Sequence, residues 1–488
     1  MSEDLFVHSL LYITAWCISY SQSHYNYLTS PSPRCPAMAL RRSLPRMSIY
    51  AIGEGWTGAL GIPHLRANIP GHNDEDVDPQ QEALLIYKGH VKQVSAGWGH
   101  TLLIDEKNQL QVVGRPHDFQ TLLRLRRLPH FIRIRNSETL FQRREGLESW
   151  IIGKLVGDDG TAHHWDSAKK YSSVSEFTNI PLPDGATPVQ VSACAGLSAV
   201  IGSNGRLYTF GLNSRGQCGT GEWSNNQWEP TMVVGLNTQG EPQLPPENAI
   251  AQVGLGLQFG VARNDKGRIF AWGKGNRGQL GIDVGEEESS EFGRWINRIC
   301  TTREQDEENM INIFQVKHIA AGMHHGAIVL DDNQVYVWGK YQSPRLKDSK
   351  ESVQAYDANF PIPVIGLPDL KVIDLSCGTH HTSVLLEDGS IWAFGLATDD
   401  MKPIHSPVQL CASGMLQMPL KQFESHFDRT TVVDSNHDVY QMNLWSNPEL
   451  QHYAVFSPTW LDLFPDKKIQ SVHRSWLHTL IVTTDDHT

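Results

Sequence analysis

Several features that mark large classes of protein are missing from this sequence. Its seven cysteines are scattered and form no CxxC pair, which argues against a disulfide framework and a zinc-thiolate site and favours a reducing intracellular compartment. Charged residues make up only 19% of the chain and the net charge is −12, so direct sequence-specific or broad electrostatic binding of nucleic acid is not expected. No run approaches the roughly 18 apolar residues of a membrane span.

Signatures of catalysis and cofactor binding are also missing. The sequence has no G-x-S-x-G elbow, P-loop or H-E-x-x-H, so we expect no side-chain catalysis, no cofactor and no metal. GEGWTG (53–58) and GKGNRG (273–278) fit G-x-G-x-x-G, but both follow repeat strands rather than opening the helix of a dinucleotide site. The equivalent loop has Asn213 at the middle glycine position. Because Asn tolerates a left-handed backbone as Gly does, turn geometry is the expected common requirement.

An internal repeat organises the chain. One block reads VSAGWGHTLLI (94–104), and related blocks start at residues 191, 253, 319, 375, 423 and 472. Six of these seven blocks are followed by a short apolar strand that starts 16 residues after the block, as at 94 and 110. Turn-forming residues such as Asn204-Gly205 lie between the two blocks. Each unit is therefore predicted to contain two antiparallel strands joined by a tight turn.

The seventh block has no partner strand after it, because the chain stops at residue 488. The missing partner is at the other end, where residues 49–53 have the form of residues 207–211. Pairing of the two ends closes a ring and removes exposed sheet edges. The predicted fold is all-β: a seven-bladed β-propeller over residues 48–488, closed by N- and C-terminal strands, with loop insertions at about 124–187 and 283–315.

Residues 1–47 are expected to be a disordered extension or a targeting segment. From Leu5 to Gly53 there is no Asp or Glu, while Arg and Ser are present, which is the bias of a mitochondrial presequence. The alternative is an upstream extension, with translation starting at Met38 or Met47. A mitochondrial location follows from the first interpretation, and the nucleus or cytoplasm is the alternative.

The units resemble those of the regulator of chromosome condensation (RCC) repeat family, whose hallmarks are a strand V-S-x-G-x-x-H-T/S and a loop W-G-x-N-x-x-G-Q-L-G. The blocks at 94 and 319 match the strand, and residues 210–219 and 272–281 match the loop. The segment IGEGWTGALGIP (52–63) is similar to a mitochondrial branch of the family. Positions that recur once per blade are expected to be structural, the histidines by hydrogen bonding to a neighbouring strand's backbone. These positions are Gly97, His100, Gly211, Gly216, Gly273, Gly278, Gly322, His325, Gly378, His381 and His478.

Charge is concentrated in the two insertions. Residues 124–144 carry seven Arg and one Glu, and residues 283–308 carry nine acids and three Arg. Loops that project from a rigid ring are common binding elements. Solvated loop charge, or for the Arg-rich stretch an amphipathic segment packed on the ring, is the alternative. The predicted binding residues are Arg124, Arg126, Arg127, Arg133, Arg135, Glu286, Glu287, Glu288, Asp306 and Glu307.

The family resemblance implies recognition of a protein partner by a monomeric ring. The first hypothesis is an interaction propeller that acts as a guanine-nucleotide exchange factor or regulator for a small GTPase. The alternative is a non-catalytic scaffold or assembly factor, with a mitochondrial location as one form of it. An enzyme that uses the central pocket is the least favoured, because no acid, base or nucleophile set stands out.

Overall fold

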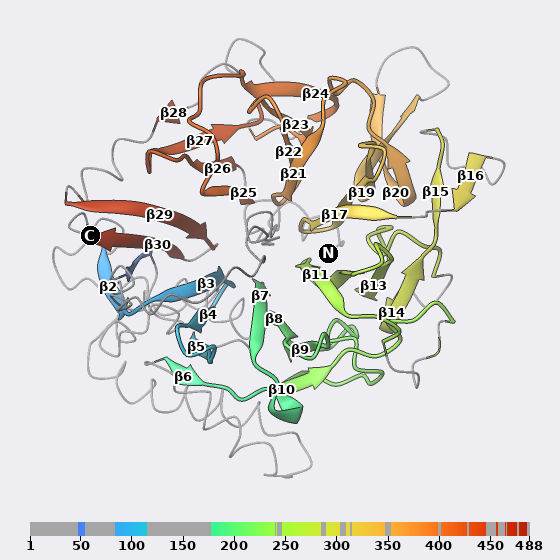
Figure 1. Ribbon diagram of the computed structural model, residues 1–488. Coiled ribbons are helices and arrows are strands. Elements are labelled where there is room, and N and C mark those ends of the chain that lie inside the picture. Colours follow the sequence, from blue (N-terminus) through green and yellow to red (C-terminus); the bar gives the residue numbers. More distant parts are fainter. Residues whose placement is uncertain are drawn as a thin grey trace, which may run out of the picture.

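The computed structural model describes residues 47–53, 83–114, 177–239, 241, 246–284, 289–302, 309–312, 315–346, 353–398, 402–426, 429–445, 455–456, 464, 466–475 and 478–485. Within these ranges the chain forms strands and turns, and its helical element is the single 3₁₀ turn Pro183–Gly185. The strands form seven four-stranded antiparallel sheets arranged around a central axis (Figure 1). The predicted seven-bladed propeller is confirmed.

Each of these sheets is one blade, and in blades 1 to 6 the four strands follow one another in the chain from the axis outwards (Figure 1). Blades 1 and 2 consist of β3 (Val91–Ala96), β4 (His100–Asp105), β5 (Leu110–Gly114) and β6 (Thr178–Asn179), then β7 (Pro188–Cys194), β8 (Leu197–Gly202), β9 (Leu207–Leu212) and β10 (Asn226–Met232). Blades 3 and 4 consist of β11 (Ile250–Leu255), β12 (Phe259–Asn264), β13 (Ile269–Lys274) and β14 (Ser289–Ile296), then β17 (Val316–Ala321), β18 (His325–Leu330), β19 (Val335–Leu346) and β20 (Val353–Pro363).

Blades 5 and 6 follow the same pattern, and a small hairpin lies between blades 3 and 4. Blades 5 and 6 consist of β21 (Val372–Cys377), β22 (His381–Leu386), β23 (Ile391–Leu396) and β24 (Pro403–Cys411), then β25 (Gln422–His426), β26 (Arg429–Val433), β27 (Val439–Asn443) and β28 (Val455–Phe456). The hairpin consists of β15 (Arg298–Cys300) and β16 (Met310–Asn312), and β15 packs beside β20.

Blade 7 combines the two ends of the chain. Its strands, from the axis outwards, are β29 (Lys467–Arg474), β30 (His478–Asp485), β1 (Met47–Gly53) and β2 (Leu84–Lys88). β1 pairs with β30 along its whole length, with Tyr50 opposite Ile481 and Ile52 opposite Thr479. The N-terminal strand therefore supplies the third strand that the seventh repeat lacks, as the sequence predicted, and the ring closes without an unpaired edge between its first and last blades.

The core lies between neighbouring blades as well as within them. Strands β4, β8, β9 and β22 are buried at every position, because each has a neighbouring blade on both faces. Between blades 6 and 7 a cluster forms from Val433, Val439, Phe464, Ile469, Val472 and Ile481. Burial on both faces explains why these strands lack the alternation of a half-exposed sheet.

The antiparallel order gives the ring two different faces. In every blade the first-to-second and third-to-fourth connections lie at one end of the strands, here called the loop face. The second-to-third turns and the connections to the next blade lie at the other end, the turn face. The segments 54–82 and 115–176, outside the described residues, join β1 to β2 and β5 to β6. Both therefore leave the ring at the loop face, and 115–176 contains most of the insertion expected at 124–187.

The expected N-terminal extension lies outside the described part of the chain, which starts at Met47. Within the described residues, no helix has the length and apolar character needed to cross a bilayer.

Candidate functional site

The ten charged residues predicted to bind a partner all lie outside the described residues, but their connections to the ring are known. The five arginines belong to the segment that joins β5 to β6, and the three glutamates of 286–288 belong to the one that joins β13 to β14. Both connections are at the loop face. Asp306 and Glu307 belong to the segment between β15 and β16, which follows the turn-face end of β14. The loop face is therefore the candidate interaction face.

The repeated histidines lie near this face at the interfaces between neighbouring blades, which are here called seams. In each case the Nε2 atom lies within hydrogen-bonding distance of a hydroxyl on the next blade, and the histidines are buried. In the next blade, the hydroxyl belongs to the residue that follows the histidine position. This explains the H-T/S pair: the histidine contacts the next blade, and the hydroxyl residue is contacted by the histidine of the preceding blade. The four contacts are His478–Thr101 at 3.1 Å, His100–Ser198 at 3.0 Å, His325–Thr382 at 3.1 Å and His381–Thr430 at 3.3 Å.

A backbone partner was expected for these histidines, and the structure adds a side-chain partner that the sequence did not predict. Before His100, His325 and His381 the glycine three residues earlier makes room for the ring, whereas before His478 that residue is Ser475, whose Oγ lies 2.8 Å from Nδ1 of His478. A Cβ atom on Gly97 would lie 2.1 Å from Cε1 of His100, and one on Gly322 would lie 2.1 Å from Cε1 of His325. Close contact with the packed imidazole therefore explains the glycine at 97, 322 and 378.

The seams that lead into blades 3 and 4 have a different chemistry. Leu197 and Phe259 stand at the histidine position, and Gly260 and Gly326 stand at the hydroxyl position of the following blades. Trp272 fills the space over Gly260, where a Cβ atom would lie 2.3 Å from its Cζ2.

The indole N–H groups of these seams bond the preceding blade. Trp272 Nε1 donates to the carbonyl oxygen of Gln217 at 2.9 Å, and Trp338 Nε1 donates to that of Gln279, also at 2.9 Å. Gln217 and Gln279 are the glutamines of the two G-Q loops. The loop motif is thus the acceptor for the tryptophan of the next blade in blades 2 and 3, two of the three blades that lack the histidine.

Backbone geometry in these loops differs from the sequence-based expectation. The left-handed conformation is adopted by Gly211 (φ 116°), Gly216 (φ 69°), Gly273 (φ 95°) and Gly278 (φ 73°), and not by Asn213. The interpretation of Asn213 as a left-handed turn residue was therefore wrong. Its buried side chain instead accepts from Cys218 N and donates to Glu222 O and Ser224 Oγ.

The seam between blades 6 and 7 carries a third arrangement. Gln422 both donates to Val472 O at 2.9 Å and accepts from Val472 N at 2.7 Å, as Gln252 does with Ile319 between blades 3 and 4, so it is Glu424 and its histidines that distinguish this seam. Glu424 Oε2 lies 3.1 Å from His473 Nδ1 and 3.9 Å from His426 Nε2, and all three side chains are buried. Burial lowers the pKa of His426 to about 4. Burial alone would raise the pKa of Glu424, but the two histidines and Gln422 lower it.

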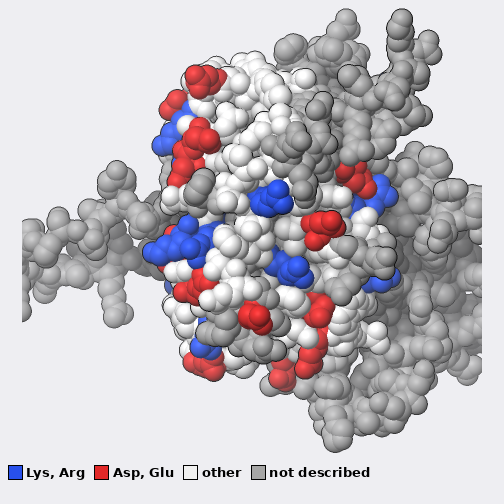
Figure 2. Space-filling view, turned by 90° about the vertical axis from the view of Figure 1, so that its right-hand side faces the viewer, with Lys and Arg blue, Asp and Glu red and all other residues white. Residues whose placement is uncertain are grey.

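Arg277 and Lys340 lie close to each other on the loop face where blades 3, 4 and 5 meet. Arg277 Nε lies 2.6 Å from Asp357 Oδ2, in an ion pair that joins the loop of blade 3 to β20 of blade 4. Burial and repulsion by Arg277 lower the pKa of Lys340 to about 8, although Asp357 opposes this. Burial and Lys340 lower the pKa of His380 to about 3, so this imidazole is neutral at pH 7. The rim over β15 and β16 differs, because there both signs of charge are interspersed (Figure 2).

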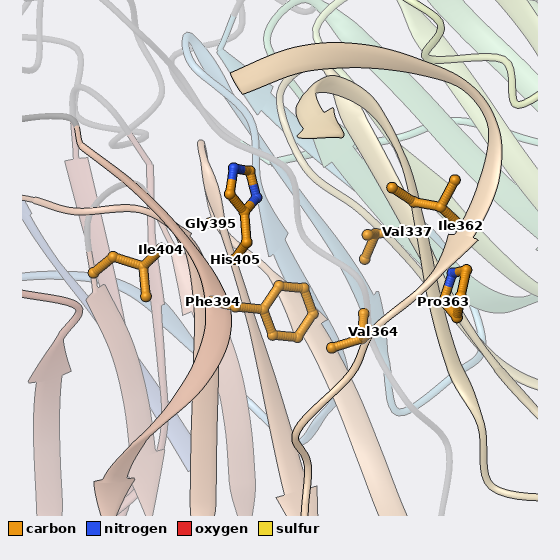
Figure 3. A pocket seen from close by; sticks show the side chains of 8 residues that line it. All are labelled: Val337, Ile362, Pro363, Val364, Phe394, Gly395, Ile404 and His405. Carbon is orange, nitrogen blue, oxygen red and sulfur yellow. The ribbon is translucent and has the colours of Figure 1, made fainter. Parts of the chain in front are cut away.

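A small pocket lies between the outer strands of blades 4 and 5. Val337 and Val364 of the blade 4 side face Phe394 of blade 5 across it (Figure 3). It has room for about one water molecule. The part of the chain that the structure describes also contains no group of three or more His, Cys, Asp or Glu residues that could hold a metal ion.

Comparisons with known proteins agree with this architecture. The family model "Regulator of chromosome condensation (RCC1) repeat" matches residues 204–262. The X-linked retinitis pigmentosa GTPase regulator homolog of Caenorhabditis elegans is 25% identical over 52% of this chain and 18% of that protein. Prp20p of Saccharomyces cerevisiae superposes with a TM-score of 0.57 and 17% identity, over 91% of this chain and 92% of that chain. Human WBSCR16 gives a TM-score of 0.58 and 16% identity, over 91% of this chain and 100% of that one.

These similarities differ in what they establish. At 16% and 17% identity the structural likeness shows the fold alone. The chain spans less than half the length of the first curated relatives that it matches, with shares from 10% to 42%.

Proposed function

Since the chain belongs to the RCC1 repeat family, we propose that it is a protein-binding propeller that regulates a small GTPase through its loop face, with nucleotide exchange as the activity. The observation that carries this proposal is the gathering of the long connections at one face of a rigid ring. The ring resembles proteins named for such partners: the C. elegans relative is called a GTPase regulator, and the report on Prp20p describes binding to Gsp1p and histones.

Nucleotide exchange suits a ring of this kind because it requires no bond to be made or broken. An exchange factor binds the nucleotide-free GTPase more tightly than the nucleotide-bound form, and this difference in affinity alone shifts the equilibrium. Seams of buried histidine and tryptophan keep the blades in fixed positions, so the ring itself loses little conformational entropy on binding. The acids at 286–288 are proposed to compete for the basic groups of the GTPase that hold the nucleotide phosphates.

Release of labelled GDP from a panel of purified small GTPases tests this proposal. We expect the full chain at micromolar concentration to accelerate release from at least one GTPase, and replacement of Glu286, Glu287 and Glu288 by Gln to reduce the acceleration. Arg206→Ala on the turn face is the matched control and is expected to leave it unchanged. Absence of acceleration with every GTPase would refute exchange; binding without acceleration would support the alternative of a scaffold or assembly factor.

We further propose that the segment before Met47 directs the protein to mitochondria. The support is its lack of acidic residues after Asp4 together with its arginines and serines. Fluorescent tagging at the C-terminus of the full chain and of a version that starts at Met47 provides the test. Mitochondrial signal that disappears in the shorter version is the expected result, and identical diffuse signal from both would contradict it.

A further inference from the structure

One loop of the loop face exposes an aromatic side chain. Residues 213–225 join β9 to β10 in blade 2, and Trp223 in this loop is 52% exposed. Among the described residues it is the one aromatic side chain in the group of exposed large apolar residues. A single exposed apolar residue needs no special explanation. The loop around Trp223 does need an explanation, because a set of specific hydrogen bonds fixes its conformation.

Hydrogen bonds hold this loop on both sides of the tryptophan. The fully buried Asn213 donates from Nδ2 to Glu222 O at 2.9 Å and to Ser224 Oγ at 3.0 Å. Its backbone N–H donates to Asn225 O at 3.0 Å. Gly221 N donates to Glu291 O of β14 at 2.8 Å, which fixes the loop against blade 3. Trp223 is therefore presented on a preformed support, which lowers the entropy lost on binding a partner.

The equivalent loop of blade 3 provides an internal comparison. Arg215 and Arg277 occupy the same position, and each backbone N–H donates to the amide oxygen of the glutamine two residues later. Arg277 is paired with Asp357 on β20. In β14 the matching position is Ser289, because Gly273 pairs with Ser290 as Gly339 pairs with Ala358.

The serine leaves Arg215 without an acid at that place. Arg215 is exposed, and within the described ranges no carboxylate forms an ion pair with it. The blade 2 loop thus differs from its blade 3 counterpart in two ways: its arginine is available to solvent, and it carries a half-exposed indole. Glu222, beside the indole, is exposed as well.

We propose that Trp223 and Arg215 form an anchor point for the protein partner. The partner segment that fits is a polypeptide with an apolar side chain, which covers the indole, and a nearby Asp or Glu. Guanidinium and carboxylate groups match in a two-pronged hydrogen-bonded pair, and Trp and Arg are the residue types that most often dominate binding at protein interfaces. This inference rests on the proposed function and locates the partner on blade 2.

Variants of the full chain test the anchor. Trp223→Ala and Arg215→Glu are compared with the wild type and with Ile365→Ala, an exposed apolar residue of the turn face. Affinity for nucleotide-free and GDP-loaded small GTPases is measured by biolayer interferometry. We expect each loop variant to weaken binding about tenfold or more, with the control unchanged and the thermal midpoint of all variants close to wild type. Wild-type affinity in Trp223→Ala would overturn the anchor and leave the proposed function intact.

Failure of the proposed function is a separate outcome. If the wild type binds no GTPase, the same proteins are applied to an array of peptides that combine Leu or Phe with Asp or Glu, and to matched peptides with Asn or Gln instead of the acids. Binding of the acidic peptides that is lost in Trp223→Ala and in Arg215→Glu, and retained in Ile365→Ala, supports the anchor. Equal binding by wild type and loop variants, or no binding, overturns it.

Discussion

Two pairs of seams connect blades of the same backbone geometry through different side chains: one pair leads into blades 5 and 6, and the other leads into blades 3 and 4. In the first pair, His325 and His381 bond a threonine hydroxyl of the next blade. In the second pair a tryptophan lies over a glycine and bonds a glutamine carbonyl of the preceding blade. Blades 2 and 3 lack the histidine, and a tryptophan in the following blade compensates for each loss. Loss of the histidine from these two repeats therefore indicates that the histidine contact is replaced by a tryptophan contact, and not that the fold is weaker there.

A comparison of the G-Q loops in blades 2 and 3 distinguishes the part of the loop that is proposed to bind a partner from the part that stabilises the ring. The tryptophan seam requires the G-Q loop of the preceding blade, and in blade 2 that loop continues to the exposed Trp223. In blade 3 the corresponding arginine is used in an ion pair within the ring. In both blades the G-Q part of the loop therefore stabilises the ring by accepting the tryptophan hydrogen bond. Of the two loops, we propose that only the one in blade 2 has an outer part that is available to a partner.

Removal of a seam tryptophan is expected to have the largest effect. Trp272→Ala empties a fully buried indole site and removes its bond to Gln217, so we expect the free energy of unfolding to fall by about 3 to 5 kcal/mol. Chemical denaturation of the full chain measures this. Trp223→Ala is the matched control, with an expected change below about 0.5 kcal/mol because the side chain is exposed. Equal effects of the two substitutions would contradict the seam.

Addition of a methyl group beside a seam histidine is expected to be the next largest. In Gly97→Ala the new Cβ would lie 2.1 Å from His100, and overpacking of this kind costs about 1 to 3 kcal/mol. The double variant Gly97→Ala, His100→Ala removes the clash. Thermal unfolding should therefore show less than additive loss in the double variant, and simple additivity would show that the glycine is not there for the imidazole.

Acid is expected to weaken the histidine seams and to spare the tryptophan seams. Burial lowers the pKa of His325 and of His478 to about 3, whereas an unfolded histidine has a pKa near 6.5. Above pH 6.5 both states are neutral and the stability contribution is complete. As the pH falls from 6.5 towards 3 the unfolded chain takes up protons that the folded chain does not, so stability falls by about 1 kcal/mol per pH unit for each histidine.

His325→Phe isolates this dependence, because Phe259 already fills the same position in blade 3. Unfolding free energies of wild type and variant are compared at several pH values between 7 and 4. As the pH falls, the unfolding free energy of the variant is expected to decrease less steeply than that of the wild type, by the contribution of one histidine. Parallel curves for the two proteins would mean that His325 is not the titrating group.

The hydrogen bond of one histidine seam is expected to give the smallest effect. Thr382→Val should destabilise the chain by about 1 kcal/mol, since it removes the partner of His325 Nε2. In the His325→Phe background the same substitution should be nearly neutral. A double-mutant cycle measures the coupling, and a coupling energy near zero would show that the seam depends on packing alone.

Much of the fold was predictable because the sequence repeats itself. The constant separation of the two blocks gave the hairpins, and the unpaired halves at 49–53 and 472 gave the closure now seen between β1 and β30. Partners across the seams were not predictable, since Trp272 and Gln217 lie 55 residues apart on different blades. A usable signal was present: in blades 2 and 3, which combine a G-Q loop with loss of the histidine, the next blade has a glycine in place of the hydroxyl residue and a tryptophan on its third strand.

The candidate site was predictable only in part. The ten charged loop residues remain predictions, because they lie outside the described residues, and eight of them belong to connections of the loop face. Trp223 was missed because exposure is decided by the fold: in this tryptophan-rich chain Trp98 is buried and Trp223 is exposed. Asn213 was misread because the loop depends on hydrogen bonds of its side chain and not on a left-handed backbone at this residue.

Hydrogen–deuterium exchange of the full chain, free and bound to its protein partner, tests most directly whether the loop face is the working surface. We expect slower exchange on binding in residues 213–225 and in neighbouring loop-face connections, with no change in the turns at 204–206 and 387–390. Protection confined to those turns, with the loop at 213–225 unaffected, would contradict it.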